Sequence, residues 1–194
     1  MFRNRVAAGL TFCALALVLA PNQAEAQCKP FKIIGGGIAP NGLPLPGEPG
    51  RPHWAVGFAT DLGFYYGEGE VQTDTANPPQ RDGTITGEFG SPVPFVFTGE
   101  NGDSLACYYG RTKFGAKQPG TFTLVPVPDL GAGWYVAHFV AEFVPYDPEC
   151  TGKFKGVSGS WIMYATSEPF VLGSSDPIGY TWEGEGALTL RKGH

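Results

Sequence analysis

Glycine and proline occur so often along the chain that they divide it into short segments. The short segments limit the folds that the chain can adopt. The sequence contains 29 glycines and 18 prolines, and between them lie runs rich in β-branched and aromatic residues. Glycine and proline interrupt regular structure, whereas β-branched and aromatic residues favour strands. Beyond residue 53, no segment shows the sustained 3.6-residue periodicity of an amphipathic helix. We therefore expect an all-β chain of short antiparallel strands joined by turns.

The expected strands lie within residues 54–190, which we interpret as one domain. The clearest turn is Asn101-Gly102, because these residues readily adopt the positive φ angles of a tight hairpin. Strands at such regular spacing indicate a barrel or a sandwich. The predicted strands are residues 54–60, 63–72, 84–89, 94–98, 104–109, 121–127, 134–145, 160–166 and 179–190.

Two strands indicate which faces are buried. In the last strand, Tyr180 and Trp182 lie on the apolar face, opposite a solvated face with Glu183. In the strand at 134–145, large and small residues alternate on one face, as the taper of a small filled barrel requires. The inner residues are Tyr135, Ala137, Phe139, Ala141 and Phe143, and the outer face carries Val136, Val140 and Val144. We expect these valines to be covered by a second subunit or by the N-terminal segment.

Residues 1–26 have the pattern of a signal peptide. Arg3 and Arg5 precede an apolar run at 6–20, and Ala24-Glu25-Ala26 places small residues where a signal peptidase cleaves. The apolar run is shorter than the roughly 20 residues that a transmembrane helix needs. We therefore expect a secreted or periplasmic protein that keeps no membrane anchor after cleavage.

The segments that flank the expected domain look irregular. Residues 27–53 contain Gly35-Gly36-Gly37 and a run rich in proline and glycine at 40–52, which predict an irregular N-terminal arm. Residues 191–194 are interpreted as a C-terminal tail.

Removal of the leader leaves Cys28, Cys107 and Cys150. In an oxidising compartment, one disulfide and one unpaired thiol are the default for this number of cysteines. We favour a bond between Cys107 and Cys150, because Cys28 lies in the expected arm. The cysteines do not show the short ligand spacing of zinc sites, so no metal and no cofactor is predicted.

The net charge of −5, without a basic cluster, argues against partners that are themselves anionic. Proteins bind nucleic acids largely by neutralising phosphates, and they bind anionic membranes through clustered lysines and arginines. We therefore expect no nucleic-acid partner and no electrostatic membrane contact.

Catalytic motifs are weak in this sequence. Ile33-Ile34-Gly35-Gly36 is similar to the new N-terminus of a trypsin-type protease, but the partners of its catalytic triad are missing. Ser158 lies in Gly-Val-Ser-Gly-Ser, which does not match the Gly-x-Ser-x-Gly turn of hydrolases. Catalytic residues therefore stay unassigned.

Four residues are candidates for ligand contact: His53, Tyr66, Glu68 and Glu70. His53 lies beside Trp54 at an expected barrel mouth. A Glu68 or Glu70 carboxylate that pointed into a cavity would suit acid–base chemistry, whereas the alternative is a solvated strand face. The aromatic residues are interpreted first as core and second as the lining of an apolar pocket: Phe58, Phe64, Tyr66, Phe95, Phe97, Phe139 and Trp182.

Three glycine-rich segments carry a family resemblance. They are Gly99-Glu-Asn-Gly-Asp-Ser-Leu105, Thr151-Gly-Lys-Phe-Lys-Gly-Val-Ser-Gly-Ser160, and the closing Tyr180-Thr-Trp-Glu-Gly-Glu-Gly. Together they resemble the secreted bacterial proteins of the allene oxide cyclase-like, or dirigent-like, group. The resemblance implies one closed antiparallel β-barrel of about eight strands with a central cavity, often assembled as a homotrimer. No position matches the catalytic residues of the plant relatives, and Glu149-Cys150 replaces the glycine pair common in the bacterial group.

These observations predict an exported β-barrel protein that binds a small apolar ligand inside the barrel. One alternative is an isomerase or cyclase that acts on a lipid-like or phenolic substrate. The other is a structural protein that functions through oligomeric contacts.

Overall fold

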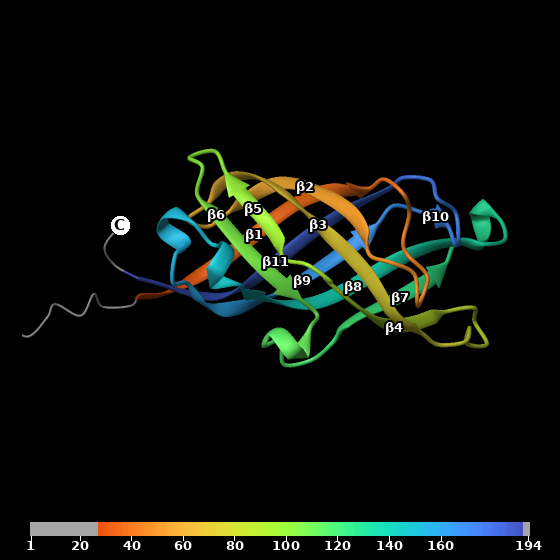
Figure 1. Cartoon of the computed structure of the whole chain (residues 1–194). Helices are drawn as coiled ribbons and strands as arrows, with labels where there is room; N and C mark the ends of the chain where they lie inside the picture. The colour runs from red at the N-terminus through yellow and green to blue at the C-terminus, as the bar shows by residue number, and fades with distance from the viewer. Residues whose placement is uncertain (1–26, 192–194) are drawn as a thin grey trace, which may run out of the picture.

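The chain is built almost entirely of β-strands in the computed structural model, which describes residues 27–191 (Figure 1). The predicted signal peptide at 1–26 lies outside the described residues. Helical structure within 27–191 consists of single 3-10 turns, and none of it is long and apolar enough to cross a membrane. The strands are β1 (Gln27–Ala39), β2 (Arg51–Ala59), β3 (Gly63–Ala76), β4 (Ile85–Gly90), β5 (Phe95–Gly99), β6 (Ser104–Tyr109), β7 (Gly120–Pro126), β8 (Trp134–Pro145), β9 (Ser158–Ser167), β10 (Phe170–Val171) and β11 (Ile178–Leu190). The 3-10 turns are η1 (Thr112–Phe114), η2 (Pro128–Leu130), η3 (Asp147–Glu149) and η4 (Gly152–Phe154).

The strands pair into a closed antiparallel ring with eight positions. β1, β2 and β3 are consecutive neighbours, and β8, β9 and β11 follow one another until β11 returns to β1. The two positions between β3 and β8 each hold two short strands in line. β3 pairs with β5 through residues 65–68 and with β4 through residues 72–76, while β8 pairs with β6 and with β7. The predicted all-β, antiparallel fold of about eight strands is therefore confirmed.

The breaks within these two positions are held together by polar contacts. Ser91, fully buried between β4 and β5, accepts a hydrogen bond on its Oγ from the backbone N–H of Tyr109 at 2.9 Å. Arg111, just after β6, donates from Nε to the Ser91 carbonyl oxygen at 3.1 Å and forms an ion pair with Asp74 on β3. Each break therefore has a defined geometry, because its backbone groups find partners across the gap.

The irregular arm predicted for residues 27–53 is wrong. Residues 27–39 form β1, which pairs with β11 along its whole length, and residues 51–53 begin β2. The glycines at 35 and 37 favour a flexible segment when the sequence is considered alone. In the structure they are strand residues, and aromatic side chains pack directly against their backbone. A Cβ atom at Gly35 would overlap the hydroxyl of Tyr65, and one at Gly37 would lie 2.5 Å from the hydroxyl of Tyr180. The irregular part of the segment is the loop at 40–50.

Aromatic side chains fill most of the interior. The rings of Phe143 and Trp161 stack with their centroids 5.1 Å apart, and the centroid of Phe97 lies 4.8 Å from that of Phe95. Such pairs stabilise a core by about 0.5–1.5 kcal/mol beyond the burial of their area. The largest fully buried side chains include Phe31, Phe95, Phe97, Tyr109, Phe143, Phe154 and Trp161. The predicted core roles of Phe95, Phe97 and Trp182 are confirmed.

Three aromatic residues predicted to be core instead face outward. Phe58, Phe64 and Tyr66 expose 50%, 67% and 45% of their surface. The reason is the limited space inside β2 and β3. A Cβ atom at Gly67 or Gly69 on the inner face of β3 would come within 2.7 Å of the Phe95 side chain. The large rings therefore occupy the opposite face of the same strands.

The outer valines of β8 are partly covered by the chain itself. Val136 and Val144 are half-buried, and the loop that contains η1 approaches Val144 at Gly115. Val140 remains 38% exposed. The residues described from 27 onward do not include an irregular arm over this face, since β1 is part of the ring.

The disulfide expected between Cys107 and Cys150 is not part of this structure, in which both residues and Cys28 are free thiols. Cys107 is fully buried on β6, opposite Phe95. Cys150 lies beside the same strand, where its Sγ accepts a hydrogen bond from the backbone N–H of Ala106 at 3.4 Å. Burial raises the pKa of both thiols, and that of Cys107 lies well above its usual value. Cys28 is exposed.

We expect a thiol-selective reagent to modify Cys28 in the native protein, and Cys107 and Cys150 after unfolding, because a buried, protonated thiol is a poor nucleophile. Mass spectrometry of native and denatured samples after labelling measures this. A disulfide between Cys107 and Cys150 would give a different result. Only Cys28 would then be labelled after unfolding, and the mass of the protein would be lower by two hydrogens.

The close approach at Gly35 predicts a sharp difference between neighbouring glycines. Gly35→Ala should lower the free energy of unfolding by about 1–3 kcal/mol, because the new methyl group must displace Tyr65, Trp182 and the Val56 carbonyl. Gly36→Ala is the matched control, since its Cβ meets the nearest atom, the Tyr180 carbonyl oxygen, at 3.1 Å on the outer face. Urea denaturation monitored by circular dichroism compares the variants, and equal stabilities would contradict the assignment.

Candidate functional site

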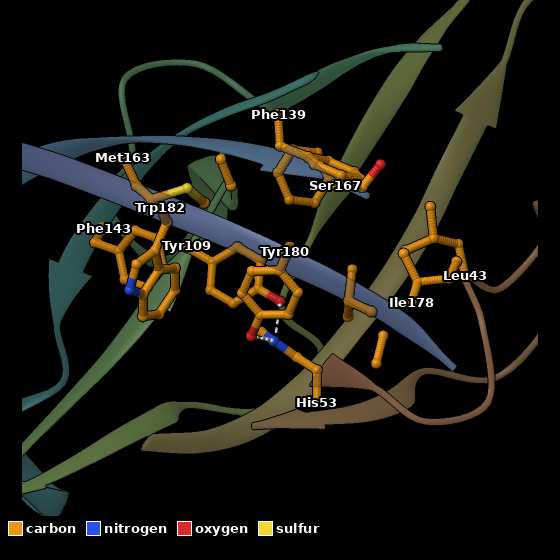
Figure 2. Close-up of a pocket in the computed structure, with 14 residues that line it drawn as sticks. Leu43, His53, Tyr109, Phe139, Phe143, Met163, Ser167, Ile178, Tyr180 and Trp182 are labelled. Atoms are coloured by element: carbon orange, nitrogen blue, oxygen red, sulfur yellow. Dashed lines mark hydrogen bonds between the residues drawn. The ribbon is translucent and has the colours of Figure 1, made fainter. Parts of the chain in front are cut away.

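A small apolar cavity lies inside one end of the ring (Figure 2). Its volume is about 50 Å³. The wall is formed by the inward-facing residues of most ring positions and by Leu43 from the loop at 40–50. The lining residues are Ala39, Leu43, His53, Val71, Phe89, Tyr109, Phe139, Phe143, Met163, Ala165, Ser167, Ile178, Tyr180 and Trp182. The other end is occupied by the aromatic core, so the ring is hollow at one end and filled at the other.

A second hollow of about 140 Å³ adjoins the first beneath the loop at 40–50. The two hollows share Leu43, Val71, Phe89 and Phe139 as wall residues. Further out, the second hollow is lined by the loop residues at 43–46 and by apolar side chains of β4 and β7. The pair therefore forms one apolar space that runs from the interior to the loop.

The loop at 40–50 covers this space and is tied down by few polar contacts. Arg51 donates to the carboxylate of Glu48 at 2.7 Å and to the carbonyl of Asn41. Glu48 also accepts a hydrogen bond from the backbone N–H of Leu45 at 2.8 Å. These contacts are at the surface, where ion pairs contribute about 0–1 kcal/mol each. These polar contacts therefore add little to the closure of the loop, which also depends on the packing of Leu43 and buried Pro44 over the hollow.

A cluster of polar groups in the cavity surrounds His53, and Ser167 also lines the cavity, where its Oγ accepts a hydrogen bond from the backbone N–H of Ala137 at 2.8 Å. Its Nδ1 lies 2.8 Å from the hydroxyl oxygen of Tyr180, and its Nε2 lies 3.0 Å from that of Tyr109. Figure 2 shows Tyr180 and Tyr109 converging on the imidazole from β11 and β6. The Tyr180 hydroxyl also donates to the Trp54 carbonyl oxygen at 2.9 Å, and the Tyr109 hydroxyl donates to that of Glu70 at 2.9 Å. The result is a linear chain of hydrogen-bonding groups that crosses the end of the ring.

This chain contains more acceptors than donors when His53 is neutral. Four short contacts link the two carbonyls, the two hydroxyls and the imidazole. A neutral imidazole has one N–H, so it and the two hydroxyls supply about three hydrogens for these contacts. One contact therefore brings two acceptors together, whichever tautomer His53 adopts.

Burial determines the charge of this group. Desolvation lowers the pKa of His53 from its usual value to about 3, and it raises the pKa of Tyr109 and Tyr180. At neutral pH the cluster is therefore uncharged. It offers hydrogen bonds to a ligand and no ionic attraction.

The structure separates the four predicted ligand residues. His53 lines the cavity, as expected for a residue at a barrel mouth. Tyr66 and Glu68 are exposed on the outer face of β3, where the Tyr66 hydroxyl donates to the Glu68 carboxylate at 3.3 Å. The Glu70 side chain shares that outer face, and its main-chain carbonyl is the group that contacts Tyr109. The hypothesis that Glu68 or Glu70 points into a cavity is wrong, because the inner face of β3 there belongs to Gly67 and Gly69.

The buried carboxylate in residues 27–191 is Glu142, on the outer side of β8 beneath the loop that contains η1. It accepts hydrogen bonds from the backbone N–H of Lys117 and from the hydroxyl of Ser160, both at 2.6 Å. Burial opposes its charge, but these bonds and the Lys117 ammonium outweigh that effect and lower the pKa of Glu142. Glu142 thus anchors a loop outside the ring and does not face the cavity.

Sequence reasoning placed Tyr180 on an inner face, but it did not connect Tyr180 or Tyr109 with His53. These residues are 127 and 56 positions from His53 along the chain. One feature of the sequence could have indicated these partners. Both Tyr109 and Tyr180 lie near the end of a strand whose inner face is otherwise apolar. Within residues 27–191, no three His, Cys, Asp or Glu side chains gather closely enough to hold a metal ion.

Comparisons with known proteins do not add a family to this geometry. No family model matches the chain, and neither the curated proteins nor the solved structures contain a significant match. The function must therefore be inferred from the site.

The buried histidine predicts a specific loss of stability in acid. An unfolded histidine binds a proton near pH 6.5, whereas His53 in the folded protein does so at about pH 3. Between these values the unfolded state holds more protons, so stability falls with decreasing pH by up to about 1.4 kcal/mol per unit. His53→Gln should remove this slope, while the outer-face control His138→Gln should keep it. Urea denaturation between pH 7 and about pH 4 measures the difference, and a slope unchanged in His53→Gln would contradict neutral burial.

Proposed function

We propose that this chain is an exported β-barrel protein that binds a small, largely apolar molecule carrying one hydroxyl group. The observation that carries the proposal is the His53 cluster, which presents neutral hydrogen-bonding groups to an otherwise apolar space. Pockets that bind small molecules combine an apolar wall with a few placed polar groups in this way. The family resemblance in the sequence supports the proposal, since it implies a barrel whose interior takes apolar ligands.

The size of the space favours a compact ligand. An apolar cavity of about 150 Å³ is large enough to hold benzene. The outer hollow of about 140 Å³ is of that size, and the inner cavity of about 50 Å³ adds room for a polar substituent next to His53. A ring-sized molecule would therefore lie with its apolar body under Leu43 and its hydroxyl toward the imidazole. A substituted phenol has this shape.

The hydrogen-bond count favours a ligand that donates. Because acceptors outnumber donors in the neutral cluster, a ligand hydroxyl supplies the hydrogen that the cluster lacks. A ligand of the same shape that can only accept leaves buried acceptors without partners, which costs about 1–3 kcal/mol. Selection of phenols over their ethers is the expected signature.

Binding is better supported than isomerase or cyclase chemistry. The titratable side chains that line the cavity are His53, Tyr109 and Tyr180. A base with a pKa of about 3 has little tendency to take a proton at pH 7, and the pKa of each tyrosine is raised above its usual value. The cluster therefore lacks an acid–base pair matched to neutral pH.

Isothermal titration with 4-ethylphenol and with its methyl ether, 4-ethylanisole, tests the proposal. We expect the phenol to bind and the ether to bind roughly tenfold more weakly, the equivalent of about one hydrogen bond. His53→Phe should remove the preference, and Ala165→Phe, which fills the inner cavity, should weaken binding of both probes. Tyr66→Phe is the matched control on the outer face and should leave both affinities unchanged.

Two outcomes would contradict this function. One is the absence of phenol binding to a folded wild-type protein. The other is binding that Ala165→Phe leaves intact, which would place the ligand outside the ring.

A further inference from the structure

The outer side of β1, β2 and β3 exposes more apolar surface than is typical of a monomeric protein. In Figure 1 these are the neighbouring orange to yellow strands. We name this surface the outer apolar face and define it by the exposed side chains of Ile34, Ile38, Trp54, Val56, Phe58, Phe64, Tyr66 and Tyr164. The most exposed are Phe64 at 67%, Val56 at 61% and Ile34 at 58%. None of these residues takes part in the cavity described above.

The strand register makes this face continuous. Ile34, Phe58 and Phe64 stand side by side across β1, β2 and β3, and Val56 is paired with Tyr66 in the next row. Ile38 is paired with Trp54 in the row beyond. Tyr164 on β9 extends the first row across β11, beyond Glu183. The rows lie on one surface because alternate residues of a strand point to the same side.

The area of this face is that of a protein interface. A large apolar side chain presents roughly 150–250 Å² when fully exposed, so eight that are about half exposed present on the order of 800 Å². The largest apolar patch of a typical monomer is about 300–600 Å². A stable protein–protein interface buries about 800 Å² on each partner. The outer apolar face therefore has the area that one side of a stable dimer requires.

Opposite charges lie at the β1 and β3 ends of the face, where the β1 charge, Lys32, has exposed Glu185 on β11 as its register partner. Lys32 on β1 is exposed just beyond Ile34, and Glu68 on β3 is exposed just beyond Tyr66. A two-fold axis that lies in the interface and runs across the strands exchanges these ends. It would set Lys32 of one copy opposite Glu68 of its partner on both sides of the contact. Between these two ends, the rows on β1, β2 and β3 carry no charged side chain, and the exposed carboxylate of Glu183 on β11 lies to one side of them, between Ile34 and Tyr164.

We infer that the outer apolar face binds a second copy of this chain in an isologous, two-fold contact. The area satisfies what a dimer needs, and the opposite charges at the ends make the face complementary to itself. The contact is independent of the proposed ligand site, because the face lies outside the ring and the cavity lies within it.

Sedimentation velocity and native mass spectrometry of the purified protein test this inference. We expect a dimer at micromolar concentration. Phe64→Ser, which removes the most exposed ring without touching the interior, should shift the protein to monomer with an unchanged circular dichroism spectrum. Glu88→Lys, an exposed carboxylate on β4 outside the face, is the control and should remain dimeric.

A charge exchange tests the two-fold arrangement itself. Glu68→Lys and Lys32→Glu should each weaken the dimer at least tenfold, because like charges then face each other. The double variant Lys32→Glu/Glu68→Lys should recover the wild-type dissociation constant to within about threefold.

Three results would overturn the inference. The first is a protein that stays monomeric at about 100 µM, a concentration well above the micromolar Kd expected of even a weak interface of this area. The second is a trimer, and the third is a dimer that persists in the Phe64→Ser variant. Co-sedimentation of a monomer with phosphatidylcholine vesicles would assign the face to a lipid surface and would equally overturn it.

Discussion

The limited space inside a ring of eight strands governs most of this structure. Several of the largest inward side chains lie against glycine or alanine on a neighbouring strand. Phe95 lies over Gly67 and Gly69, while Tyr65 and Trp182 meet above Gly35. There the Trp182 Nε1 donates to the Tyr65 hydroxyl at 2.7 Å, and that hydroxyl donates to the Ile34 carbonyl. The close packing of this interior thus depends on glycine as much as on the aromatic residues.

The same constraint produces both surfaces to which we attach a function. Because β2 and β3 present small residues inward at Ala55, Gly57, Gly67 and Gly69, Phe58, Phe64 and Tyr66 lie on the outer face. At the end of the β-sheet ring near His53, no aromatic side chain from the facing strands fills the interior. A hollow therefore remains there. The same packing therefore leaves apolar surface in two places, one on the outside of the ring and one inside it.

Much of this fold is predictable from the sequence, and the failures have physical causes. Strands such as β5 and β6 are bounded by clear turn residues, so Asn101-Gly102 locates them almost to the residue. β1 was missed because its three glycines suit a loop as well as a crowded strand. The faces of β2 and β3 were reversed because alternation alone does not say which side is inside. His53 was found, but its tyrosine partners depend on the register of the closed ring, which local pattern does not contain.

The in-line breaks in the ring have a mechanical consequence. Because β4 is separated from β5, and β6 from β7, the hollow end and the aromatic end are joined by the continuous strands but not by these two positions. The hairpin-like unit of β4 and β7 contacts the remainder mainly through the far half of β3 and through β8. Such a unit can behave as a separate cooperative segment, whose amide hydrogens exchange with solvent faster than those around Trp161. Local opening of this unit would widen the hollow end and leave the packing of the aromatic end unchanged.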